Sequence, residues 1–161
     1  MTLYTTHPSP LGELLLAGPE PGLLSSVTVP GQKGGATIRS DWRRDPAAFA
    51  EPVRQFDAYF AGELTEFSIP LVTAGSAFRE RVWAALERVP YGTTVSYGTL
   101  AAMAGLAPNA VRAVGGAVGA NPLTVIRPCH RVLGANGSLT GFASGLDRKR
   151  HLLTLEGVAL S

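Results

Sequence analysis

The sequence predicts an α+β protein in two parts: a small N-terminal lobe of β-sheet plus helix, residues 1–75, and a mainly helical C-terminal lobe, residues 76–161, with a helix-turn-helix. Short β-type runs separated by proline- and glycine-rich turn signals fill the beginning of the chain. In the second half, apolar residues recur at helical spacing. A chain of 161 residues, of which 45% are hydrophobic and 16% charged, is long and apolar enough to bury a core.

The N-terminal lobe is predicted to contain strands followed by a helix. The expected elements are strands over Thr2–His7, Gly12–Ala17 and Leu23–Val29, a loop or ragged strand over Gly31–Asp45, a helix from Pro46 to Gly62, a strand over Glu66–Leu71 and a linker over Val72–Gly75. Proline suits the first turn of a helix, and glycine ends one. The apolar residues at helical spacing in that helix are Phe49, Val53, Phe56 and Phe60.

The C-terminal lobe is predicted to be built from helices. The expected helices run from Ser76 to Pro90, from Ser96 or Tyr97 to Met103, from Asn109 to about Val118, and over the amphipathic residues 146–157. Ser76 can cap the first of them, whose apolar stripe is Phe78, Val82, Leu86 and Val89. The two middle helices flank Gly105, a good C-terminal stop, and match a helix-turn-helix. The match alone is weak, because any two short helices around a glycine look similar.

The second helix of this pair, VRAVGGAVGANP, is unusual for a recognition helix. A helix that reads the major groove carries several long polar side chains, yet Arg112 is the only charge here. Small residues allow another segment or molecule to approach the helix backbone closely. For the glycines we expect tight packing against a neighbouring helix of the same chain. Arg112 suits a functional contact and an ordinary surface position equally well.

The charge is distributed unevenly along the chain. Residues 1–75 carry five Lys/Arg and eight Asp/Glu, a net charge of −3, whereas residues 76–161 carry nine and four, a net charge of +5. Such a split arises by chance, or it marks a C-terminal half that meets a polyanion such as nucleic acid.

Several classes of protein are not expected. No apolar run approaches the roughly 18 residues of a membrane span, and the N-terminus lacks the basic and apolar regions of an export signal. One cysteine cannot form an intramolecular disulfide, and with three histidines it makes a poor structural zinc site. The expected environment is therefore a reducing cytoplasm.

The single cysteine lies in the polar run Arg127-Pro128-Cys129-His130-Arg131-Val132. A lone cysteine is often just a small buried hydrophobe. Only the thiolate is strongly nucleophilic, however, and the neighbours of Cys129 suit a nucleophile: His130 as a base, with Arg127 and Arg131 as sources of positive potential. A base also needs an orienting group. Glu156, beside leucines at the end of the last helix, is the best acidic candidate, although periodicity alone favours an exposed carboxylate there.

Five stretches follow one another over about residues 76–158: VPYGTTVSYGTLAAMAG, RAVGGAVGANP, PCHRV, LTGF and RKRHLLTLEG. In their order and close to their spacing, these stretches resemble the O6-alkylguanine-DNA alkyltransferases, also called methylated-DNA–protein-cysteine methyltransferases. PCHRV looks like the active-site signature of that family. The first lobe is compatible in size and pattern with the family's variable N-terminal domain.

The resemblance implies single-turnover repair of duplex DNA that contains O6-alkylguanine. Cys129 accepts the alkyl group, His130 acts as base through a water, and Glu156 orients His130. The target nucleotide must be rotated out of the duplex. No cofactor, metal, membrane or obligate protein partner is implied, and a monomer is expected.

The resemblance also assigns the remaining site residues. Arg112, with Ala113 beside it, matches the intercalating arginine of a helix that lies in the minor groove. Tyr97 matches the tyrosine that hydrogen-bonds a ring nitrogen of guanine. Asn121 matches the asparagine that joins the helix-turn-helix to the active-site strand. Main-chain atoms near Cys129 and Val132 read the exocyclic amine, and the loop with Phe142, Ala143 and Ser144 closes the pocket.

Three positions depart from the family pattern. Arg127 replaces a residue that is usually aliphatic, and it can face solvent, pair with an acid or raise the local positive potential. Phe142 replaces a common tyrosine, so a hydroxyl is lost. Ala143-Ser144 replaces a smaller pair such as Gly-Gly, which can narrow the pocket, although the Ala143 amide can still donate to O6.

Three other functions compete with repair. A non-catalytic sensor of alkylated bases lacks the cysteine, which this chain keeps. A transcriptional regulator with this helix-turn-helix usually has a further domain with metal-binding cysteines. A thiol hydrolase with Cys129, His130 and Glu156 fits the residue types, but not the DNA-type motifs around them.

Overall fold

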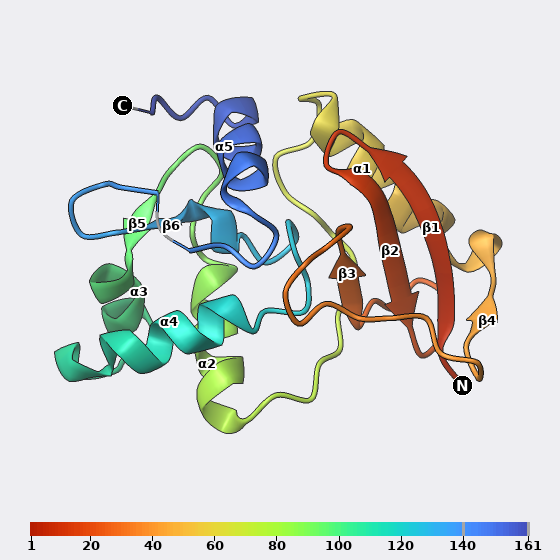
Figure 1. The fold of residues 1–161 in the computed structure, drawn as a ribbon, viewed down its shortest axis with the longest axis horizontal. Coiled ribbons are helices and arrows are strands. Elements are labelled where there is room, and N and C mark those ends of the chain that lie inside the picture. Colours follow the sequence, from red (N-terminus) through yellow and green to blue (C-terminus); the bar gives the residue numbers. More distant parts are fainter. Residues whose placement is uncertain (140, 161) are drawn as a thin grey trace. The chain divides into compact units, whose positions relative to one another are not determined.

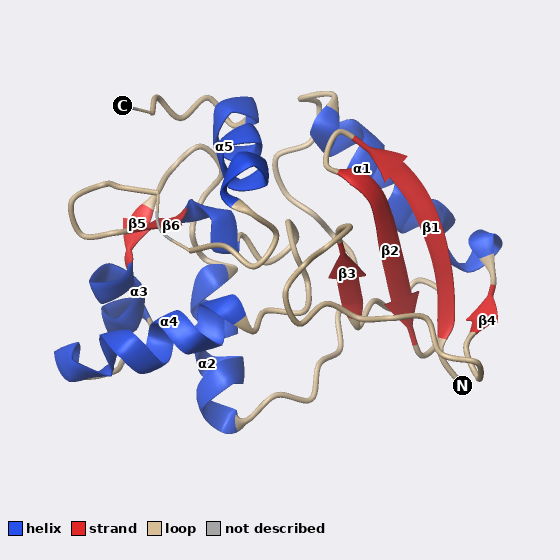
Figure 2. Ribbon diagram, viewed as in Figure 1, coloured by secondary structure: helices blue, strands red, loops and turns tan. Residues whose placement is uncertain are grey.

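The computed structural model describes residues 1–139 and 141–160 and divides the chain into two compact units. Unit 1 comprises Met1–Thr73 together with Pro122–Thr124, and unit 2 comprises Ala74–Asn121 and Val125–Ser161. Figures 1 and 2 show strands concentrated in unit 1 and helices in unit 2, so the α+β fold class is confirmed. No helix within the described ranges is long and apolar enough to cross a membrane.

Unit 1 is built on a four-stranded sheet with the strand order β3-β2-β1-β4. The strands are β1 (Leu3–Ser9), β2 (Gly12–Gly18), β3 (Ser26–Thr28) and β4 (Arg43–Arg44). β1 and β2 form an antiparallel hairpin whose register runs from Leu3–Gly18 to Ser9–Gly12, and it is the long red pair in Figure 1. α1 (Ala50–Phe60) follows a short 3-10 turn that begins at Pro46, and its Phe56 and Tyr59 are fully buried.

The prediction of a strand over Glu66–Leu71 is wrong. In the described residues this segment contributes only an isolated bridge between Leu24 and Leu71. Pro70 has no amide hydrogen to donate, and it accepts from the Leu24 amide instead. The Ser68 amide donates a hydrogen bond of 2.8 Å to Oε1 of Gln55, a buried residue of α1. A side chain therefore accepts the hydrogen bond that the backbone of a neighbouring strand would accept in a sheet.

Residues 122–124 belong to unit 1 although the chain on either side of them belongs to unit 2. The Val27 amide donates to the Pro122 carbonyl at 2.9 Å, and Val27 forms a parallel bridge with Leu123. Thr124 Oγ1 lies 3.2 Å from Oε1 of Gln32. The chain returns to unit 2 at Val125, whose φ of 76° is rare for a β-branched residue.

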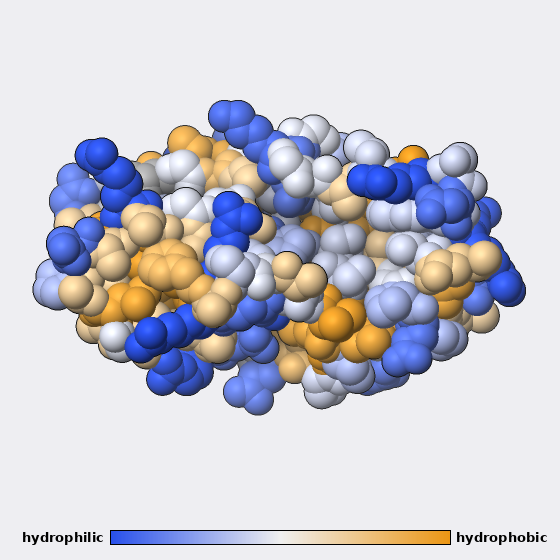
Figure 3. All heavy atoms as spheres, turned by 90° about the horizontal axis from the view of Figure 1, so that it is seen from below, coloured by the Kyte–Doolittle hydropathy of each residue, from blue (hydrophilic) through white to orange (hydrophobic). Residues whose placement is uncertain are grey.

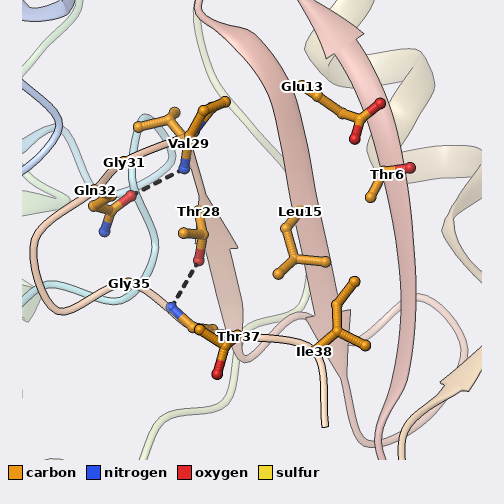
Figure 4. A pocket seen from close by; sticks show the side chains of 12 residues that line it. Thr6, Glu13, Leu15, Thr28, Val29, Gly31, Gln32, Gly35, Thr37 and Ile38 are labelled. Atoms are coloured by element: carbon orange, nitrogen blue, oxygen red, sulfur yellow. Dashed lines mark hydrogen bonds between the residues drawn. The ribbon is translucent and has the colours of Figure 1, made fainter. Parts of the chain in front are cut away.

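A pocket of about 450 Å³ lies on unit 1, beside strands β1 to β3 and the loop after β3 (Figure 4). Thr28 Oγ1 and the Gln32 side chain shape its wall by accepting hydrogen bonds from the amides of Ala36 and Val29. None of the predicted site residues lines this pocket.

Unit 2 begins with three helices that pack on one another: α2 (Ala77–Leu86), α3 (Tyr97–Met103) and α4 (Val111–Gly119). Ser76 and Ser96 cap α2 and α3 by accepting hydrogen bonds from the amides three residues later, which confirms both predicted starts. Gly105, with φ of 72°, follows the end of α3 as predicted. The Trp83 indole donates to the Ala117 carbonyl at 2.8 Å and ties α2 to α4.

The remainder of unit 2 holds the motif with the cysteine. A 3-10 turn over Cys129–Arg131 leads into β6 (Val132–Leu133), which pairs in parallel with β5 (Val95–Ser96) just before α3. α5 (Leu146–Leu155) then closes the unit, as predicted for residues 146–157.

Candidate active site

Cys129 lies at the start of the 3-10 turn, which is closed by a backbone hydrogen bond from the Arg131 amide to the Pro128 carbonyl. Its side chain is 6% exposed and belongs to the apolar core of unit 2. Tyr97 and Phe142 are partly buried and pack against the same apolar core. Val132, the next residue after the turn, is fully buried.

His130 and Glu156 form a buried pair. The distance from His130 Nε2 to Glu156 Oε2 is 2.8 Å, and both side chains are completely inaccessible to solvent. A carboxylate can only accept, so Nε2 carries the hydrogen and Nδ1 presents its lone pair. Nδ1 is the one buried side-chain nitrogen or oxygen without a hydrogen-bond partner among the described residues. Burial lowers the pKa of His130, and Glu156 opposes that shift, so the imidazole is neutral at pH 7.

Glu156 is held by more than the histidine. Arg131 donates from Nε to Oε1 at 2.8 Å and from Nη2 to Oε2 at 2.9 Å, and the Gly92 amide donates to Oε1 at 3.2 Å. Arg131 Nη1 also donates to the Val89 carbonyl at 2.6 Å. The carboxylate therefore accepts at least four hydrogen bonds and is fixed in one orientation, which in turn fixes the imidazole. An exposed helix-end carboxylate is ruled out for Glu156.

The two arginines beside Cys129 both have carboxylates as partners. Arg131 is committed to Glu156. Arg127 is buried, with its guanidinium 5.0 Å from the centroid of the Trp83 ring and its Nε 3.4 Å from Glu87. Of the roles left open for Arg127, the structure therefore shows pairing with acids.

Burial raises the pKa of the Cys129 thiol, so the resting sulfur is protonated at neutral pH. A hydrogen bond from Asn121 and the charge of Lys149 oppose this shift. Asn121 also donates from Nδ2 to the Arg127 carbonyl at 3.0 Å. This hydrogen bond connects the residue after α4 to the segment that precedes the cysteine turn.

The loop before α5 contributes Phe142, Ala143 and Ser144. Ser144 is buried, Ala143 is half-buried, and the Ser144 carbonyl accepts a hydrogen bond from Arg148 at 2.9 Å. The predicted LTGF motif includes Thr140, which lies outside the described residues.

Lys149 is a buried residue of the site that the sequence reasoning missed. Its Nζ donates to the Val132 carbonyl at 2.6 Å and lies 5.8 Å from the centroid of the Phe142 ring. A signal for it was present, because Lys149 precedes the buried residues Leu152 and Leu153 by three and four positions and so shares their face of α5.

α4 buries one face and exposes a face of small residues. Val114, Ala117 and Val118 are buried, whereas Arg112 and Ala113 are exposed. A Cβ atom added at Gly116 or Gly119 would meet no atom of the described residues within 4 Å, and one at Gly115 would only reach ordinary contact with the Tyr97 ring. The expectation that these glycines permit tight packing within the chain is therefore wrong. The small face is free to approach another molecule closely.

The positive charge of the C-terminal half is partly internal. Arg127, Arg131 and Lys149 are buried, whereas Arg79, Arg112 and Arg150 are exposed. Figure 3 shows hydrophobic groups lying among strongly hydrophilic side chains on the face that it displays. In the part of the chain that is described, no three His, Cys, Asp or Glu side chains gather as a metal site requires.

Comparisons with known proteins cover nearly the whole chain. Residues 2–73 match the ribonuclease-like domain of 6-O-methylguanine DNA methyltransferase, and residues 77–158 match the DNA-binding domain of the same family. The methylated-DNA–protein-cysteine methyltransferase of Mycolicibacterium paratuberculosis is 52% identical over 97% of this chain and 93% of its own length. The corresponding protein of Methanosarcina acetivorans is 48% identical over 96% and 97%.

Solved structures agree with the sequence comparison. The crystal structure of Mycobacterium tuberculosis OGT in complex with DNA has a TM-score of 0.88 and 51% identity, covering 96% of this chain and 92% of that chain. The resemblance inferred from PCHRV and its flanking motifs is confirmed. The chain therefore belongs to the 6-O-methylguanine DNA methyltransferase family and is a DNA-binding repair protein that acts by alkyl transfer.

Proposed function

We propose that the chain transfers the alkyl group from O6 of guanine in duplex DNA to Sγ of Cys129, once per molecule. The observation that carries this proposal is the buried Glu156–His130 pair on the cysteine turn, whose free Nδ1 lone pair is available to a water. A purely structural histidine at this depth would have both ring nitrogens bonded.

In the proposed reaction the neutral imidazole acts as a general base. His130 Nδ1 takes the thiol proton through a bridging water, and Glu156 stabilises the imidazolium that forms. The sulfur–carbon bond forms as the bond from carbon to O6 breaks, and the electron pair of that bond goes to the guanine. Tyr97 polarises the leaving guanine by donating a hydrogen bond to a ring nitrogen. The guanine takes up one proton from the solvent and leaves unmodified, and the imidazolium of His130 returns one proton to the solvent. The thioether on Cys129 is stable, so the protein is consumed.

DNA docking is assigned to α4. Its exposed small face lies in the minor groove, and Arg112 fills the stack from which the guanine has been rotated. The glycines support this assignment because no described residue packs so closely against them that an added Cβ would clash. Main-chain atoms of Cys129 and Val132, with the loop containing Phe142, Ala143 and Ser144, bind the extruded base.

We further propose that residues 76–161 form the DNA-binding and active-site domain and residues 1–75 an N-terminal lobe. The protein acts in the cytoplasm as a monomer, without a cofactor or an obligate protein partner. These assignments follow from the sequence pattern, and repair by the purified chain alone tests whether a cofactor or a protein partner is needed.

The decisive experiment is intact-mass analysis after the chain is mixed with duplex DNA containing O6-methylguanine. The proposal expects a gain of one methylene group's mass, located on Cys129 and absent in Cys129→Ser. The same duplex with unmodified guanine is the control for lesion specificity. Binding to the damaged duplex with no change in protein mass would instead establish the non-catalytic sensor.

A further inference from the structure

A tight turn between α2 and β5 reaches the buried carboxylate of the site. The Thr93 amide donates to the Pro90 carbonyl at 3.2 Å and closes a four-residue turn. Gly92, at the third position of this turn, has φ of 74°. A type II turn requires a positive φ at that position, so the turn favours glycine there. The proposed mechanism assigns no role to these four residues.

This turn and the residue before it hold both members of the buried Arg–Glu ion pair. The Val89 carbonyl accepts a hydrogen bond from Nη1 of Arg131 at 2.6 Å. The Tyr91 ring faces the same guanidinium, with its centroid 5.7 Å from Cζ. The Gly92 amide donates to Oε1 of Glu156 at 3.2 Å. The segment thus offers a carbonyl and a ring face to the cation and an N–H group to the anion, which suits the charge of each partner.

A side chain at Gly92 would disturb the contact with Glu156. A Cβ atom there would lie 3.1 Å from the backbone oxygen of Glu156, which is closer than ordinary van der Waals contact, so the end of α5 would have to move by a few tenths of an ångström. The positive φ adds strain for a residue that carries a Cβ. Because Oε2 of Glu156 lies 2.8 Å from Nε2 of His130, a displacement of Glu156 would pass directly to the imidazole.

The amide of the turn also acts on the charge that the carboxylate presents. Burial lowers the pKa of His130 most strongly, Glu156 opposes this shift, and the charges of Arg131 and Lys149 add to it. The titratable group of the turn itself is Tyr91, whose ring contacts Arg131. Hydrogen bonds to a carboxylate stabilise its negative charge and weaken its attraction for a neighbouring proton. Each donor to Glu156 therefore helps to keep the imidazole neutral.

We propose that Gly92 is a positioning residue for the general base: its amide orients the Glu156 carboxylate toward His130 and limits the negative charge that the imidazole experiences. This inference rests on the proposed function of His130 as the base. Glycine is required because the turn needs a positive φ and the end of α5 leaves no room for a Cβ. Gly92 acts on the reaction through Glu156 and His130.

The first test removes the N–H donor and adds no atom beyond the exchange. In Gly92→glycolic acid an ester oxygen replaces the amide N–H, and the pKa of His130 is measured by NMR from its ring Cε1–H resonance. With one donor fewer, the carboxylate attracts the proton more strongly, so His130 should titrate about 0.5–1 pH unit higher than in wild type. The acid limb of the single-turnover repair rate should move in the same direction.

The matched control is the same exchange at Gly22. Gly22 has φ of 77° and donates its amide to the Ala48 carbonyl within unit 1. This control should leave the titration of His130 unchanged. A wild-type pKa of His130 in the Gly92 ester would overturn the inference even if repair were slower, because a slower rate alone would indicate a merely structural role.

The second test adds a methyl group instead. Gly92→Ala is compared with Gly22→Ala, since both residues have nearly the same φ but a Cβ at Gly22 would meet no described atom within 4 Å. Small displacements of a reacting group are costly, so single-turnover repair of duplex DNA containing O6-methylguanine should be about tenfold slower for Gly92→Ala. Gly22→Ala should keep the wild-type rate, and equal rates for the two variants would overturn the inference.

The titration of His130 involves no DNA, so it is independent of the repair assay. A wild-type chain that transfers no methyl group would overturn the proposed function, whereas the effect of the Gly92 amide on His130 is decided by the titration of the ester variant. The ester variant introduces no Cβ, so the inference stays open to refutation even if Gly92→Ala fails to fold.

Discussion

Replacing Gly116 by alanine separates folding from DNA binding. Glycine in a helix interior costs about 0.5–1 kcal/mol relative to alanine. Gly116 lies within the nine-residue helix α4, and an added Cβ would meet no atom within 4 Å. No clash offsets the gain in helix propensity, so Gly116→Ala should raise the free energy of unfolding by about 0.5–1 kcal/mol.

The same methyl group should weaken binding to duplex DNA. It stands on the face that the proposed function places in the minor groove, where close approach leaves no room for it. Crowding of a packed contact costs about 1–3 kcal/mol, so the dissociation constant should rise at least about fivefold. Gly116→Leu should bind more weakly still.

Two assays at one fixed salt concentration suffice: urea unfolding for stability, and fluorescence anisotropy with a labelled duplex for affinity. Alkyl transfer from a free O6-alkylguanine base, which needs no docking to a duplex, is the control and should keep its wild-type rate. Wild-type affinity for Gly116→Ala would refute the assignment of α4 to the groove. A loss of stability would show that the glycine packs within the chain after all.

Three further predictions concern the cysteine turn. Glu156→Gln leaves the buried Arg131 without its ion-pair partner, so it should lower the free energy of unfolding by about 3 kcal/mol and slow alkyl transfer. Urea unfolding and single-turnover kinetics measure the two effects. Wild-type values in both assays would contradict a stabilising role of the Arg131–Glu156–His130 network. Because the pKa of His130 is lowered from 6.5 and that of Cys129 raised from 9.0, both groups are mostly neutral from about pH 7 to pH 8. The single-turnover rate should therefore be nearly flat over this range and fall below it as the base is protonated, whereas a tenfold rise per pH unit would indicate attack by free thiolate without a base. Arg127→Ile should change the alkylation rate less than Arg112→Ala changes duplex repair, since the Arg127 side chain contacts Trp83 and Glu87 rather than the sulfur; the reverse order would refute a peripheral role.

The starts and ends of the helices could be read from the sequence because the signals act over one turn. Ser76 and Ser96 accept hydrogen bonds from amides only three residues away. Gly62 and Gly105 adopt φ values of 77° and 72°, which favour glycine and end a helix locally. The motif around Cys129 was equally local, since its residues are contiguous in the chain.

The strand predicted over Glu66–Leu71 shows where local reasoning stops. Its pattern is compatible with a strand, but strand formation requires a partner that the pattern does not specify. The Ser68 amide donates its hydrogen bond to the side chain of Gln55, 13 residues earlier. Residues 122–124, not this segment, lie beside Val27. Which segments become neighbours is decided by the packing of the whole unit.

The partners of the buried charges were likewise decided by the tertiary structure. The sequence placed Arg127 and Arg131 beside Cys129, yet Arg127 contacts Glu87, 40 residues away, and Arg131 contacts Glu156, 25 residues away. Lys149, which is distant from Cys129 in sequence, donates to the carbonyl of Val132 just after the cysteine turn. Electrostatic interactions depend on distance in space and on burial, and neither quantity exists until the chain has folded.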